Sequence, residues 1–390
     1  MHDVLILGAG KIGALISGLL GQSGAYRVTL ADMAADAARS VANAHGLDTI
    51  HAAQLDATDE TALRAYFVKN SHAAVISSLP YYCNPLVAKL ARERGMHYFD
   101  LTEDVAVTKA VREHAQGSRQ AFVPQCGLAP GFISIAAHEL MTHFDDWVSV
   151  KLRVGALPQH PSNALQYSLT WSTDGLINEY CNPCVAILDG KQVELPPLEG
   201  MEEIEIDGTR YEAFNTSGGL GSLGETFGAR CETMDYKTMR YPGHCQQMRL
   251  LLNDLKLRHD RATLKRILEN AVPTTLQDVV VIYVSVAGHQ DGELREENYV
   301  SKIYPQVIAG RLWSAIQVTT AAGICAVVDL VVESGNRFQG FITQETFRLG
   351  DILGNRFGRY YAPGGSKDVS ADLVAGGKGG RQRRTARGAT

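Results

Sequence analysis

The sequence lacks the features that would point to a membrane or to a nucleic acid. No apolar run reaches the roughly 18 residues that a membrane-spanning helix needs, and the formal net charge is only −5 over 390 residues. The first residues also lack the basic stretch that opens a secretory signal. We therefore expect no membrane and no nucleic acid as a partner.

Cysteines are few, and their arrangement is not that of a disulfide framework. Seven of them are scattered between Cys83 and Cys325, and a scattered odd number suits reduced thiols in a cytoplasmic protein. Cys181 and Cys184 form a single C-x-x-C pair, whereas a structural zinc site needs a second pair of ligands. The sequence predicts no metal site and a cytoplasmic location.

What the sequence does contain is a glycine-rich turn near its start. The apolar run Val4 to Leu7 is followed by Gly8, Gly10 and Gly13 in G-x-G-x-x-G spacing, with Lys11 and Ile12 between them and a helix-compatible segment after them. This pattern is typical of a buried strand that leads through a tight turn into a helix, with the N-terminus of the helix facing a pyrophosphate. We interpret this stretch as a dinucleotide-binding turn.

Asp32 specifies the nucleotide further. It ends a second predicted strand, Tyr26 to Leu30, at 24 residues after Gly8, close to the roughly 20 expected for the acid that holds the adenosine ribose. A carboxylate accepts hydrogen bonds from two ribose hydroxyls but repels a 2′-phosphate, and no Arg or Lys lies beside Asp32. The sequence therefore favours NAD over NADP.

Strand-like and helix-like segments alternate as far as about residue 125, which predicts a doubly wound parallel sheet of the Rossmann type. Ligands collect at strand ends in such sheets, so we expect Ser78, Leu79 and Pro80 near the nicotinamide ribose. Asp56 follows another strand, and two interpretations stay open for it: a contact to the adenine, or a cap for the helix from Glu60 to Lys69.

A polar cluster follows the predicted strand that ends near Asp100. We place Leu101 beside the cofactor and treat Asp100, Thr102, Glu103 and Asp104 as site candidates, although about two of the cluster are expected to cap the helix that begins at Val105. Cys126 and the Gly/Pro turn after it, residues 127–131, mark the predicted crossing between domains, with Cys126 as a buried thiol.

Beyond about Val148 the hydrophobic period changes to short alternating strands, including Tyr167 to Trp171. We predict a second, α+β domain with a mostly antiparallel sheet. The predicted divisions are 1–130 for the NAD-binding domain, 131–310 for the substrate and oligomerisation domain, 311–362 for a helical return to the first domain, and 363–390 for a disordered tail rich in Gly and basic residues.

Four polar segments of the second domain are candidates to hold a substrate: residues 155–161, 171–180, 215–219 and 235–244, all interpreted as loops. The last has the densest chemistry, with Lys237, Arg240 and His244 within eight residues. Arg is the residue that fits a carboxylate with two parallel hydrogen bonds. Lone Arg and His residues are nevertheless more often structural.

Several of these motifs together resemble the saccharopine dehydrogenase-like superfamily and, within it, the lysine 6-dehydrogenases. They are Gly8-Ala9-Gly10, the turn at 127–131, the segment 157–161, and the stretches 175–180 and 237–244. The resemblance covers about residues 3 to 360. It implies a Rossmann domain interrupted by an α/β domain, NAD-dependent oxidative deamination of the ε-amino group of L-lysine to 2-aminoadipate 6-semialdehyde, which cyclises, and a homodimer or higher homo-oligomer.

Two departures distinguish this chain from the saccharopine reductases of that superfamily. Ala129 stands where they carry an acidic residue, and Thr216 stands near a position where they carry an arginine. Loss of a carboxylate-binding arginine suits lysine, which has fewer carboxylates than saccharopine. A saccharopine dehydrogenase and a non-catalytic NAD-binding regulator stay open as alternatives.

The resemblance also implies roles for the residues of the second domain. Arg240 is expected to bind the α-carboxylate, with Lys237, Thr216, Trp171 and Tyr180 as further substrate contacts. For the catalytic steps we expect Asp100 or Glu179 to hold the amino groups or act as the base, and His244 to transfer protons.

Overall fold

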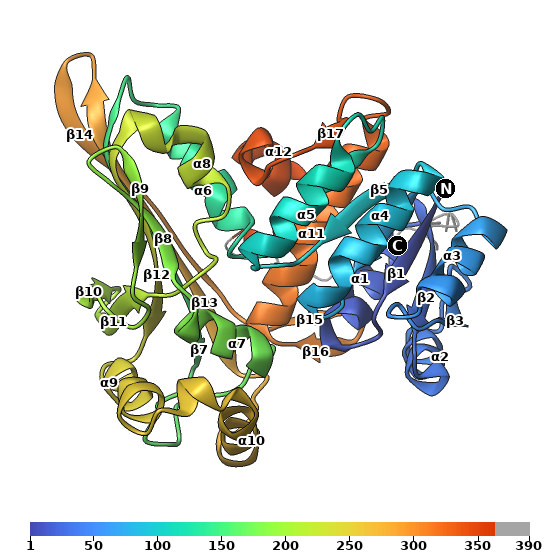
Figure 1. Cartoon of the computed structure of the whole chain (residues 1–390), viewed down its shortest axis with the longest axis horizontal. Helices are drawn as coiled ribbons and strands as arrows, with labels where there is room; N and C mark the ends of the chain where they lie inside the picture. Colours follow the sequence, from blue (N-terminus) through green and yellow to red (C-terminus); the bar gives the residue numbers. More distant parts are fainter. Residues whose placement is uncertain (363–390) are drawn as a thin grey trace, which may run out of the picture.

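A seven-stranded sheet, parallel throughout, forms the first domain of the computed structural model, which describes residues 1–362 (Figure 1). The predicted tail, 363–390, lies outside the described residues. From one edge to the other the strands are β17 (Gly340–Phe341), β6 (Ala121–Val123), β5 (His97–Asp100), β4 (Ala74–Ser77), β1 (His2–Leu7), β2 (Tyr26–Asp32) and β3 (Ile50–Gln54).

Helices cover both faces of this sheet because its central strands are apolar on both sides. In β1, Val4 and Ile6 pack into one core and Leu5 and Leu7 into another. The first core receives α1 (Lys11–Gln22), α2 (Ala35–His45) and α11 (Ala315–Glu333); the second receives α3 (Glu60–Lys69), α4 (Asn84–Arg94) and α5 (Val105–Ala115). The predicted Rossmann-type fold is confirmed.

The second domain is built on an eight-stranded mixed sheet in which only β7 (Trp147–Pro158) and β12 (Cys231–Arg240) are paired in parallel. The main path runs β10 (Glu202–Ile206), β11 (Thr209–Asn215), β12, β7, β13 (Asp278–Gln290) and β14 (Glu293–Ile303), with β8 (Cys184–Leu188) and β9 (Lys191–Leu195) beside β12. Its helices are α6 (Phe132–Met141), α7 (Thr173–Cys181), α8 (Leu223–Phe227), α9 (His244–Arg249) and α10 (Arg261–Ala271).

Several predicted segments of the second domain are wrong in type. Residues 167–171 form no strand, 173–181 form α7 instead of a loop, and the segments at 155–161 and 235–244 belong largely to β7 and β12. The polar residues of β12 suggested a loop, but they lie in a buried strand because their charges are neutralised by partners within the sheet. Residues 311–313 are a strand, β16, paired with β15 (Gln306–Ile308), and the expected helix begins only at Ala315.

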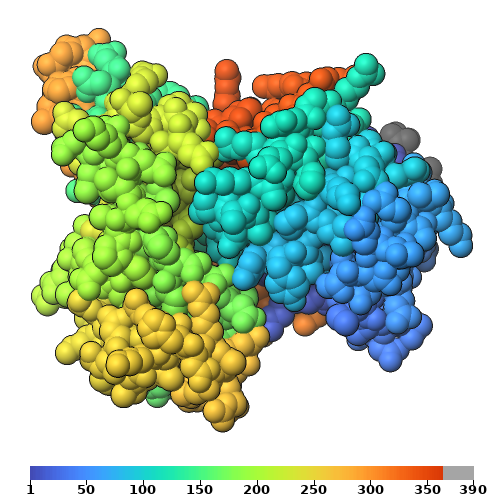
Figure 2. Space-filling view, viewed as in Figure 1, coloured from blue at the N-terminus to red at the C-terminus, as the bar shows by residue number. Residues whose placement is uncertain are grey.

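After the second domain the chain rejoins the first. Ser314 caps α11 with a capping box, and the carboxylate of Asp278, the first residue of β13, accepts hydrogen bonds from the N–H groups of Ala315 (2.6 Å) and Ile316 (3.0 Å). Helix α11 packs along α1, β17 extends the first sheet, and α12 (Leu349–Gly354) follows. One continuous apolar core therefore joins the two domains, which lie side by side in Figure 2.

Within residues 1–362, α11 is the one helix long and apolar enough to cross a membrane by length and composition. Its apolar stretch is 89% buried inside the protein. Small residues let it pack closely: a Cβ on Gly323 would lie 3.1 Å from the carbonyl oxygens of Cys126 and Gly127. The helix is a core element that supports the turn after β6.

Candidate active site

The glycine-rich turn between β1 and α1 has the geometry of a dinucleotide cradle. A Cβ on Gly8 would lie 2.4 Å from the Ser78 carbonyl oxygen, and one on Gly13 would lie 1.9 Å from the Gly8 carbonyl oxygen, so neither position admits a side chain. Gly10, the N-cap of α1, has no side-chain cap, and a Cβ there would meet no other atom within 4 Å. The free N–H groups of the first helical turn thus face open space, which suits a pyrophosphate.

Asp32 is held at this turn. One carboxylate oxygen accepts a hydrogen bond from the Ala9 N–H (2.8 Å) and the other from the Ala34 N–H (2.9 Å). Each oxygen keeps a lone pair for a further donor. The residue lies at the C-terminal end of β2, where the ribose of a dinucleotide is expected. These features of the turn and of Asp32 fit a nicotinamide dinucleotide.

A cavity of about 800 Å³ extends from this turn into the second domain. Its walls come from the ends of β1, β4 and β5, from the 127–130 turn, and from β7, α7 and β12. The site residues predicted from the sequence that line it are Gly10, Lys11, Ile12, Ser78, Leu79, Pro80, Leu101, Glu103, Trp171, Glu179 and Arg240. Residues from both domains therefore meet around one space.

Arg240 is a buried cation at the wall of the cavity. Its side chain is 2% exposed, its Nε donates to the Tyr180 hydroxyl (2.9 Å), and one Nη donates to the Met239 carbonyl (2.9 Å). No carboxylate of residues 1–362 lies within ion-pairing distance of it. A guanidinium has five N–H donors, so three stay free for a ligand.

Tyr180 and His244 position Arg240 from behind. Neither lines the cavity. His244 Nδ1 faces the Leu165 carbonyl (2.8 Å), which makes Nδ1 the donor and leaves Nε2 to accept from the Tyr180 hydroxyl (3.0 Å). Burial and the nearby Arg240 charge lower the pKa of His244 to about 3. His244 is therefore a neutral residue of the supporting network, and its predicted role in proton transfer is wrong.

Glu179 is the acidic group with the most altered titration in the cavity. It lies on α7 and is 8% exposed. Burial raises its pKa to about 8; the charge of Arg240 opposes this rise and that of Glu103 adds to it. A carboxyl group with a pKa near 8 gains and loses its proton at mildly alkaline pH, so it can act as an acid or a base in a reaction at that pH.

Asp100 has a different role from the one expected. It is fully buried, and its oxygens accept from the Tyr98 hydroxyl (2.6 Å) and from the N–H groups of Thr102 (2.9 Å) and Gln125 (3.1 Å). Asp104 caps α5 through the Val107 N–H. These bonds shape the turn after β5, and Asp100 does not line the cavity. Glu103 is the acidic residue of this cluster that does.

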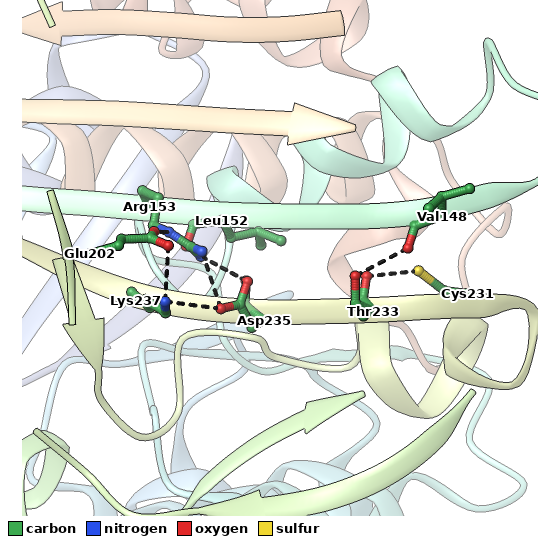
Figure 3. A network of polar contacts seen from close by, with 8 residues as sticks. All are labelled: Val148, Leu152, Arg153, Glu202, Cys231, Thr233, Asp235 and Lys237. Carbon is green, nitrogen blue, oxygen red and sulfur yellow. Dashed lines mark hydrogen bonds and ion pairs between the residues drawn. The ribbon is translucent and has the colours of Figure 1, made fainter. Parts of the chain in front are cut away.

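Three other predicted residues also lie away from the cavity. Lys237 pairs with Glu202 (3.0 Å) and Asp235 (3.7 Å) in an ionic network around the buried Arg153 (Figure 3). Thr216 is buried and does not line the cavity. Asp56 accepts from the N–H and hydroxyl of Thr58, whereas the cap of α3 is Asp59. The cap interpretation of Asp56 is therefore wrong, and its contact to the adenine stays a prediction.

Sequence patterns missed several polar residues of the cavity. Thr170 is 4% exposed, and its hydroxyl has no hydrogen-bond partner within the described residues. Asn178 accepts from Arg261 (2.8 Å), and both line the cavity. Thr170 and Arg261 follow no motif, whereas Asn178 lies within the predicted segment 171–180 without having been singled out there. Residues 1–362 contain no group of three side chains suited to a metal ion.

A Rossmann domain with an open phosphate cradle, joined by one cavity to a second domain with a buried arginine and an acidic wall, defines a nicotinamide-dependent dehydrogenase. Comparison with known families agrees with this class. Residues 4–123 match the saccharopine dehydrogenase NADP binding domain, and residues 127–354 match the saccharopine dehydrogenase C-terminal domain. The chain belongs to the saccharopine dehydrogenase family of oxidoreductases.

Individual relatives are more distant. The mitochondrial alpha-aminoadipic semialdehyde synthases of rat and mouse are 23% and 24% identical over 198 and 201 residues, which is 49% of this chain but only 21% of theirs. The chain thus matches about a fifth of those proteins. Saccharopine dehydrogenase (L-Glu forming) from Saccharomyces cerevisiae shares the fold, with a TM-score of 0.73, 17% identity, and coverage of 91% of this chain and 96% of that one.

Proposed function

We propose that this protein oxidises the side-chain amino group of L-lysine with NAD, releasing 2-aminoadipate 6-semialdehyde, NADH, ammonium and one proton per water consumed. The observation that carries the proposal is the buried, carboxylate-free guanidinium of Arg240 in a cavity that also holds Glu103 and Glu179. Lysine, which has one carboxylate and an excess of positive charge, complements that set.

The substrate carboxylate is assigned to Arg240. Its three unused N–H donors allow the two-pronged geometry that a carboxylate prefers, and Tyr180 and Met239 fix the plane of the guanidinium. Thr170 lines the same cavity, and its buried hydroxyl has no hydrogen-bond partner among the described residues.

The proton of the reacting amine is assigned to Glu179. A free lysine ammonium has a pKa of about 10.4 and cannot lose a hydride from its carbon until it is deprotonated. Glu179, with a pKa of about 8, is largely ionised above pH 8 and can accept that proton. When bound, the nicotinamide would accept the hydride, and Glu179 can then assist the addition of water to the resulting imine.

NAD is proposed as the cofactor because Asp32 presents a carboxylate where NADP would place a phosphate. Its neighbour Met33 is 67% exposed and offers no positive charge. We also propose a cytoplasmic homo-oligomer; the seven free cysteines support a reducing compartment, and light scattering would test the assembly.

Incubation of the protein with NAD and either L-lysine, saccharopine or L-ornithine at mildly alkaline pH tests the proposal. We expect NADH absorbance to grow with lysine. Growth with saccharopine alone would make the protein a saccharopine dehydrogenase, which the family membership favours as the second candidate. Silence with all three, despite NAD binding, would contradict both.

A further inference from the structure

Glu103 is the one acidic residue of the 100–104 turn that lines the cavity. Asp100 and Asp104 are committed to backbone N–H groups of the turn and of α5. Glu103 comes from the cofactor-binding domain, two residues after Leu101, which also lines the cavity. Glu103 therefore lines the cavity from the side of the cofactor-binding domain.

The second domain fixes the backbone of Glu103 by a close approach. Gly218 has a φ of +87°, and a Cβ there would lie 2.8 Å from the Glu103 carbonyl oxygen and 3.1 Å from its Cβ. The neighbouring Ser217 donates its N–H to the Glu179 carbonyl (3.0 Å) and its hydroxyl to the Asn178 carbonyl (3.2 Å). The 217–218 backbone thus connects Glu103 to the helix that bears Glu179.

Side chains make a second connection. Asn178 Oδ1 accepts from Arg261 (2.8 Å), which leaves its amide N–H₂ group as the end that can donate, and the Asn178 side chain opposes the rise in the pKa of the Glu103 carboxyl that burial causes. On the other side of Glu179 in the chain, Tyr180 holds Arg240. Asn178, Glu179 and Tyr180 therefore link Glu103 to Arg240 through consecutive residues of α7.

We propose that Glu103 is a specificity-determining residue that binds the side-chain ammonium of a diamino acid, opposite Glu179, when the substrate carboxylate is on Arg240. The inference rests on the proposed function and names the residue that selects a substrate with a distal cation. The ammonium favours the ionised form of Glu103 against the rise in its pKa that burial causes, and Glu179 receives the proton. The charge of Glu103 also adds to the rise in the pKa of Glu179, as expected for two carboxyl groups in one site.

Binding, measured by calorimetry on the protein saturated with NADH, tests this assignment without turnover. L-lysine is compared with L-2-aminohexanoate, which has the same carbon chain and α-amino acid head but no distal ammonium. We expect the wild type to prefer lysine by at least about tenfold, the loss expected when a charged hydrogen bond is removed. In Glu103→Gln that preference should disappear through weaker binding of lysine alone.

Two further variants control the result. Glu269→Gln removes an exposed carboxylate from the rim of the same cavity and should leave the preference unchanged. Glu103→Asp keeps the negative charge and should retain part of the preference for lysine. Equal loss of both ligands in Glu103→Gln, or an unchanged preference for lysine, would overturn the assignment, as would a wild type that does not bind lysine.

These outcomes separate the inference from the proposed function. A wild type that prefers lysine through Glu103 yet forms no NADH from lysine and NAD would contradict the proposed reaction and keep the assignment of Glu103. A wild type that oxidises lysine, with a Glu103→Gln variant that retains the tenfold preference, would support the proposed reaction and contradict the assignment of Glu103.

Discussion

Replacing Arg240 with methionine would separate substrate binding from structural support. Methionine has similar length and no charge, and the change removes a guanidinium that lines the cavity and has three N–H donors unused within the described residues. Each hydrogen bond to a charged group contributes about 1.5–3 kcal/mol, so loss of a two-pronged contact costs about 3–6 kcal/mol. That predicts a fall of about 10²- to 10⁴-fold in kcat/KM for lysine.

The stability of the same variant should change far less. A buried cation without a carboxylate partner destabilises the free protein, while removal of Arg240 leaves the Tyr180 hydroxyl and the Met239 carbonyl each short of a donor. These two effects oppose each other. Initial rates with lysine and with NAD varied in turn, together with a thermal unfolding curve, provide the assay. A variant with an unchanged KM for lysine, or one that loses stability and binds NAD poorly, would refute the reasoning.

Three other changes give defined outcomes. The rate should increase as the pH rises through about 8, and pH–rate profiles should show no such increase for Glu179→Gln. Glu179 has a higher pKa in the folded protein than in the unfolded chain, so its contribution to the free energy of unfolding should decrease as the pH rises from about 4.5 to 8. Denaturant titration should show this decrease in the wild type and not in Glu179→Gln. Gly13→Ala should abolish NADH binding, followed by fluorescence, since its Cβ would lie 1.9 Å from a backbone oxygen. Asp32→Ser combined with Met33→Arg should lower the KM for NADP and raise that for NAD; unchanged constants would remove Asp32 from cofactor selection.

The first domain was largely predictable because its signals are local. The apolar strand β1, the glycines after it and Asp32 at the end of β2 all lie within one strand–helix–strand unit of about 30 residues. Helix α3 also begins and ends at the predicted residues, Glu60 and Lys69. In such segments the hydrophobic period and the caps determine the structure without reference to distant residues.

The second domain was less predictable because its polar residues are explained only by partners far along the chain. Asp235 and Lys237 of β12 form ion pairs with the buried Arg153 and with Glu202 on other strands, whereas their charges in the sequence suggest a solvated loop over 235–244. Arg240, which was predicted from its motif, differs from them. It lines the cavity and has no carboxylate partner among the described residues. Sequence spacing alone does not distinguish these two kinds of buried charge.

The central claim is that the hydride leaves the side-chain carbon that bears the ε-amino group. The most direct measurement uses L-lysine deuterated at that carbon, with mass spectrometry of the reduced cofactor. The account predicts that one deuterium per turnover appears in the cofactor, and that lysine deuterated at the α-carbon transfers none. Deuterium transferred from the α-carbon, or a reaction that proceeds only with saccharopine, would contradict it.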